Sequence, residues 1–239
     1  MIELLLIIVI ELLILYFLSQ KLTQILYSIF FAVFKNKHTE YGIITFIYLP
    51  GTAVHELAHL IIAEILRVPT GELSFTPKFE KNVSGQEKLK AGSLKIGNSD
   101  PLRRYLIGFA PVFIGLMVLC LLIWLFQYFW PQMADLKSQM ILIIITGYLI
   151  FAISNNMFSS KKDLEGFLIF LPVMVLVISA AYFAGIRINL TDQALSVTNR
   201  LLTGLSQALG IVIGINIVVL LINIIVLKSL NKLNSLFKF

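Results

Sequence analysis

The sequence has little charge, almost no cysteine and no repeats. Only 13% of its 239 residues are charged, whereas a soluble globular domain carries about 25%. The single cysteine, Cys120, excludes a disulfide framework, and the lack of a tandem repeat excludes a solenoid. No polar segment is long enough to hold a separate soluble domain. We therefore expect a single membrane domain that comprises residues 1–239.

Apolar sequence is what the chain has in abundance. Hydrophobic residues make up 58% of it, and the mean hydropathy is +0.91. Several apolar stretches approach or exceed the roughly 20 residues that a helix needs to span a bilayer. These features predict an all-α polytopic protein of the cell membrane, with about six transmembrane helices. The predicted spans are residues 2–18, 43–68, 105–130, 140–158, 164–186 and 205–227.

The distribution of Lys and Arg predicts the orientation. With the N-terminus inside, thirteen of the nineteen basic residues fall on cytoplasmic segments, in agreement with the positive-inside rule. This topology accounts for the net charge of +6, so we do not expect a nucleic-acid partner. The apolar run 25–34 is too short to cross, and either lies along the membrane surface or extends the first helix.

The most informative motif is His55-Glu56-Leu57-Ala58-His59, an HExxH sequence inside the second predicted span. Two histidines four residues apart project from one face of a helix, so both imidazoles can bind one metal ion. Glu56 is close enough to accept a proton from a water at the metal without being a ligand. Because zinc with a neighbouring carboxylate is the hydrolytic pair of zinc peptidases, we predict a Zn²⁺ site. Ionisable groups inside a membrane span are costly, which argues against a chance match.

A catalytic zinc usually takes three protein ligands, so HExxH needs one more. Asp163 is the candidate, because it lies at the junction of the fourth and fifth predicted spans, on the cytoplasmic side where the HExxH span also ends. Glu165 competes, but two residues on a helix differ by about 200°, so only one of them can face the metal. Both acids also suit the first turn of the fifth helix, where they would act as cap and dipole partner.

Asn155 precedes Asp163 by eight residues, and with HExxH this spacing resembles the site-2 protease family of zinc intramembrane metalloproteases. The sequence from Asp163 to Gly166 stands where the family usually has Asp-Gly-Gly, and Lys162 replaces the usual Leu. The resemblance covers about residues 49–166. It implies an endopeptidase with a core catalytic region of about 43–186. His55, His59 and Asp163 would hold zinc, Glu56 would be the catalytic base, and Asn155 would bind the backbone of a membrane protein substrate.

Residues 71–77 and 91–97 alternate apolar and polar side chains as strands do, with Leu94 and Ile96 on one face. We expect a membrane-associated β-hairpin over residues 71–97, with the polar residues 78–90 as its loop. The resemblance also implies a hairpin just after the HExxH helix. Its edge, including Leu94 and Ile96, is predicted to pair with an unwound transmembrane segment of the substrate.

Two functions from other classes use the same features. A divalent-cation transporter would also place His and Asp in the membrane, but such carriers often show paired repeats, and this cluster occurs once. A transporter also has no need of Glu56 between its ligands, and the intact motif argues against a non-catalytic membrane scaffold. A prenyl-protein endopeptidase would use Glu as third ligand, so the choice between Asp163 and Glu165 bears on it.

Overall fold

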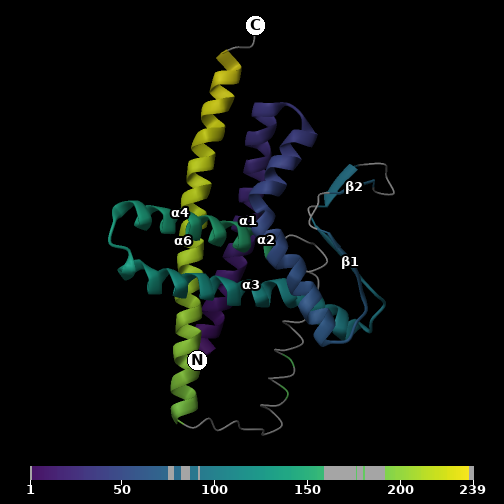
Figure 1. Ribbon diagram of the computed structural model, residues 1–239, viewed down its shortest axis with the longest axis vertical. Helices are drawn as coiled ribbons and strands as arrows, with labels where there is room; N and C mark the ends of the chain where they lie inside the picture. The colour runs from purple at the N-terminus through teal and green to yellow at the C-terminus, as the bar shows by residue number, and fades with distance from the viewer. Residues whose placement is uncertain are drawn as a thin grey trace.

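The computed structural model describes residues 2–74, 78–81, 87–90, 92–158, 176, 180 and 192–236. This part of the chain is mainly helical (Figure 1). Five of its helices are long and apolar enough to cross a membrane, consistent with a membrane protein. The fifth predicted span, residues 164–186, falls almost entirely outside the described residues. The helices are α1 (Ile2–Phe34), α2 (Lys37–Ile65), α3 (Pro101–Phe129), α4 (Leu136–Asn156) and α6 (Asp192–Leu236).

Helix α1 continues well past the predicted end of the first span at residue 18. The polar residue Ser19 fits inside it because its hydroxyl donates to the carbonyl of Tyr16 at 2.8 Å. Beyond it, Leu22, Leu26 and other apolar side chains stay buried on the inner face. The run 25–34 therefore extends the first helix, which was one of the two alternatives.

Helix α2 starts after Asn36, whose side chain accepts a hydrogen bond from the backbone N–H of His38 at 2.9 Å. An N-cap of this kind satisfies a backbone donor that the first turn leaves unpaired. The helix ends before Arg67, whose φ of 54° reverses the chain direction. The backbone N–H of Val68 then donates to the carbonyl of Ala63 at 2.8 Å, which leads the chain into the strands.

Two antiparallel strand pairs follow α2. Strand β1 (Thr70–Ser74) pairs with β4 (Ser93–Ile96), with Leu73 opposite Leu94. The stretch predicted as a polar loop, residues 78–90, instead contains β2 (Lys78–Lys81) and β3 (Glu87–Lys90). The loop prediction was wrong because these segments also alternate apolar and polar residues, and the pairing sets Phe79 opposite Leu89.

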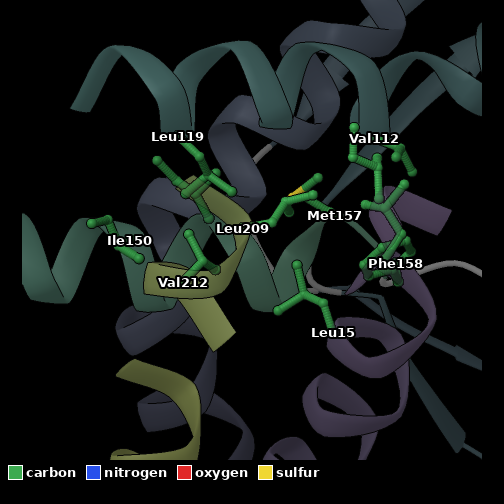
Figure 2. Close-up of a cluster of buried hydrophobic side chains, with 11 residues drawn as sticks. Leu15, Val112, Leu119, Ile150, Met157, Phe158, Leu209 and Val212 are labelled. Atoms are coloured by element: carbon green, nitrogen blue, oxygen red, sulfur yellow. The ribbon is translucent and has the colours of Figure 1, made fainter. Parts of the chain in front are cut away.

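Helices α3 and α4 form an antiparallel hairpin through a short 3₁₀ turn, η1 (Trp130–Gln132), and run across the direction of α6 (Figure 1). Their buried side chains meet those of α1 and α6 in one apolar core (Figure 2). This core fixes the crossing of α3 and α4 next to α2. Its labelled members are Leu15, Val112, Leu119, Ile150, Met157, Phe158, Leu209 and Val212.

Candidate metal centre

Helix α2 turns the polar face of the HExxH motif inward. The side chains of His55, Glu56 and His59 are all buried, with exposed fractions of 5%, 8% and 7%. The opposite face of the same turns carries Leu57 and Ile61, which are exposed. An apolar outer face with polar groups inside is the arrangement that a bilayer favours, because ionisable side chains there must face protein.

The two imidazoles meet through their ring nitrogens. Nε2 of His59 lies 3.2 Å from Nε2 of His55, and Nδ1 of His59 lies 2.8 Å from the carbonyl oxygen of Ile107 on α3. A carbonyl oxygen only accepts hydrogen bonds, so Nδ1 of His59 carries the proton and donates it. In a neutral ring the Nε2 atom of His59 then carries no proton, and its lone pair points toward His55.

This spacing fits a tetrahedral metal. Two nitrogens bound to zinc at about 2.0–2.1 Å with tetrahedral angles lie about 3.3–3.4 Å apart. The observed 3.2 Å between the Nε2 atoms is close to that value. The hydrogen bond from His59 to Ile107 is also the kind of outer contact that fixes the tautomer and ring orientation of a metal-binding histidine. The spacing of the two histidine nitrogens is thus compatible with the predicted zinc site.

The third ligand remains a prediction. Within the described part of the chain, no group of three His, Cys, Asp or Glu side chains could hold a metal ion. Asp163 and its competitor Glu165 both lie outside the described residues. The structure therefore brings together two of the three predicted ligands, and the identity of the other is a question for metal analysis.

A backbone segment covers Glu56. A Cβ atom built on Gly92, the residue just before β4, would lie 2.8 Å from Cγ2 of Thr52. It would also lie 3.0 Å from both Cγ and Oε1 of Glu56. The chain entering β4 therefore packs directly on the carboxyl group that is predicted to act as base. Sequence reasoning missed Gly92, although a glycine in a predicted strand often marks such a close backbone approach.

Helix α4 approaches α2 one turn before His55. A Cβ on Gly51 would overlap the carbonyl oxygen of Ala152 and lie 2.6 Å from Nδ2 of Asn156. The same amide nitrogen donates to the carbonyls of Ala152 at 3.0 Å and of Tyr48 at 3.3 Å. Asn156 therefore lies against the HExxH helix.

Asn155 faces the neighbouring helix α6. Its Nδ2 atom lies 2.8 Å from the carbonyl oxygen of Phe151 and 2.6 Å from Oδ1 of Asn216. Asn216 is fully buried and was not singled out from the sequence, although an asparagine in an apolar span is itself a signal. The other predicted substrate-binding residues, Leu94 and Ile96, lie on β4, with Leu94 half-buried and Ile96 exposed.

Comparison of the chain with models of known protein families, with curated proteins and with solved structures gives no match. The assignment of chemistry to this site therefore rests on its residues and their geometry.

Proposed function

We propose that this chain is a zinc-dependent endopeptidase that hydrolyses a peptide bond in or near a transmembrane segment of a membrane protein. One observation carries the proposal. Two buried histidine nitrogens lie 3.2 Å apart on a helix whose opposite face is apolar and exposed. A buried glutamate stands between them in sequence, and the Ile107 carbonyl fixes one ring. Two imidazole nitrogens at this distance could both bind one metal ion once the proton between them is displaced.

Each residue of the motif has a separate task. Zinc, when bound, would polarise the scissile carbonyl and lower the pKa of the attacking water toward neutrality. His55 and His59 would hold it through Nε2, with Asp163 as the third ligand. Glu56 would take the proton from the water and pass it to the leaving amine. The backbone at Gly92 limits where the carboxyl group of Glu56 can move, which supports a fixed base.

The substrate must be at least partly unwound before it is cleaved. A transmembrane helix pairs every backbone carbonyl internally, so a scissile carbonyl is reached only after those hydrogen bonds open. Strand β4 pairs with β1 on one side, and no second strand pairs with it among the described residues. An extended substrate segment would pair with that other edge, beside Leu94 and Ile96, and recover main-chain hydrogen bonds.

The active face would be cytoplasmic, from the distribution of basic residues, and the partners would be a membrane protein substrate and the lipid bilayer. Glu56 separates this function from a divalent-cation transporter. A carrier releases its ion and needs no proton acceptor between two ligands, whereas hydrolysis cannot proceed at a useful rate without one.

The test is co-expression with candidate single-span proteins, comparing the intact chain with Glu56→Gln. The glutamine has nearly the same shape but cannot accept the proton. We expect a cleavage product that appears with the intact chain and is absent with the variant, while both bind one zinc per chain. Equal cleavage by both would remove the hydrolytic assignment. Loss of zinc in the variant would make Glu56 a ligand and break the proposed division of tasks.

A further inference from the structure

A closed polar cluster lies where α4 meets α6. Ser154, Asn155 and Asn216 are buried, with exposed fractions of 0%, 6% and 0%, and come from the two helices α4 and α6. Burying a polar group inside a membrane protein costs free energy unless the group is hydrogen-bonded to other side chains or to the backbone.

Backbone carbonyls determine which way both amides point. Nδ2 of Asn155 lies 2.8 Å from the carbonyl of Phe151, and Nδ2 of Asn216 lies 3.0 Å from the carbonyl of Val212. Carbonyl oxygens accept only, so each of these amide atoms must be the nitrogen. The contact of 2.6 Å between the two side chains is then a donation from Asn155 Nδ2 to Asn216 Oδ1. Ser154 takes the second proton of Asn216 at 2.9 Å.

One acceptor is left over. The Oδ1 atom of Asn155 is buried and has no hydrogen-bond partner among the described residues. Both protons of its amide nitrogen are already used, by Phe151 and by Asn216. Asn155 can therefore offer an incoming group only an oxygen, and that group must be a donor. Neighbouring atoms cover this oxygen, so they must move when a ligand arrives.

We infer that Asn216 is a positioning residue, which holds Asn155 so that its side-chain oxygen accepts a backbone N–H of the substrate. The inference rests on the proposed function, because an unwound transmembrane segment supplies N–H groups that have lost their own partners. A buried acceptor without a partner favours such a donor, since pairing removes the desolvation penalty on both sides. Besides the carbonyl of Val212 on its own helix, Asn216 bonds the side chains of Ser154 and Asn155 on α4, so its link to a substrate would run through Asn155.

The first experiment removes the hydrogen bond between Asn155 and Asn216. The probe is a synthetic peptide that carries the transmembrane segment of a protein cleaved in a Glu56-dependent way. Asn216→Leu should lower kcat/KM by about three- to tenfold, the loss expected for one hydrogen bond, with zinc content unchanged. Asn216→Asp keeps an oxygen for Asn155 Nδ2 and should retain more activity than the leucine variant. Ser19→Ala, which removes a buried hydroxyl on α1, is the control for a general packing effect.

The second experiment identifies the hydrogen bond itself. Replacing single amides of the peptide by esters removes one N–H at a time without changing the side chains. For the intact chain, one position near the scissile bond should lose about three- to tenfold in kcat/KM. The same ester should cost nothing further with Asn155→Leu or Asn216→Leu, because the acceptor is absent or misdirected. A merely structural role for the cluster would leave the ester effect unchanged in both variants.

The outcomes distinguish a failure of the proposed function from a failure of the positioning role of Asn216. If the intact chain and Glu56→Gln treat the peptide alike, the proposed function fails and this inference fails with it. If cleavage depends on Glu56 but Asn216→Leu has unchanged kcat/KM, or keeps the ester effect of the intact chain, the positioning role alone is refuted.

Discussion

Adding a single methyl group at Gly92 should displace Glu56, the proposed catalytic base, without contacting His55 or His59, the proposed metal ligands. In Gly92→Ala the new Cβ would lie 2.8 Å from Cγ2 of Thr52 and 3.0 Å from Cγ and Oε1 of Glu56. Carbon atoms pack at about 3.5–4.0 Å, so these contacts are too short by about 0.5–1 Å. The Glu56 side chain or the strand must move by that distance.

The kinetic cost follows from the geometry of proton transfer. Misplacing a reacting group by about 1 Å can cost on the order of 100-fold in rate. We therefore expect kcat of Gly92→Ala to fall by about 10- to 100-fold, with zinc bound at the level of the intact chain. Adding Thr52→Ser removes the Cγ2 atom, which is the closest of the three contacts, and should restore part of the lost rate.

The assay is cleavage of a transmembrane peptide by purified protein in detergent, with metal content measured on the same samples. Gly97→Ala is the matched control, since its Cβ would meet Pro69 at 2.8 Å at the other end of β4. A comparable loss in Gly97→Ala would mean that any disturbance of the strand pair suffices. Normal turnover by a well-folded Gly92→Ala would refute the idea that this backbone constrains Glu56.

Three further predictions concern the rest of the chain. Asp163→Asn should abolish zinc binding while Glu165→Gln keeps it, as metal analysis will measure; the reverse result would transfer the ligand role to the glutamate. Ile96→Pro should impair peptide cleavage with zinc unchanged, because proline disturbs an edge that pairs through the backbone, and normal cleavage by a folded variant would leave the strands without a substrate role. The backbone N–H of Ser138 lowers the pKa of Asp135 at the start of α4. The ionised carboxylate therefore stabilises the fold fully above its ordinary pKa of about 3.9, and this contribution is lost as the pH falls through the lower folded value. Asp135→Asn should flatten the pH dependence of the melting temperature in that range, and an unchanged profile would contradict the assignment.

Membrane character and the position of the histidine pair were predictable, because both depend on local pattern. A span is recognised from consecutive apolar residues, and the approach of His55 to His59 follows from the pitch of one helix. Helix ends were less predictable. The first helix continues through Ser19 because a side-chain hydrogen bond and a buried face beyond it compensate for the polar interruption.

Contacts between distant segments could not be derived from the sequence. The packing of Gly92 on Glu56 and the pairing of Asn155 with Asn216 join residues that only the three-dimensional arrangement brings together. Residues 78–90 were misjudged for another reason, since their charge suggested a loop while their alternation was that of strands. Backbone pairing in register between 78–81 and 87–90 shows that charge alone does not exclude strands.

The close contact at Gly51 brings helices α2 and α4 together with no room for a side chain between them. Helix α2 carries the histidine pair, and α4 ends at Asn156, so the contact between Gly51 and Ala152 sets how closely the two helices approach beside the proposed site. Any larger side chain at residue 51 would force α2 and α4 apart. If the proposed metal site is right, a substitution at residue 51 would lower metal binding although the residue is no predicted ligand.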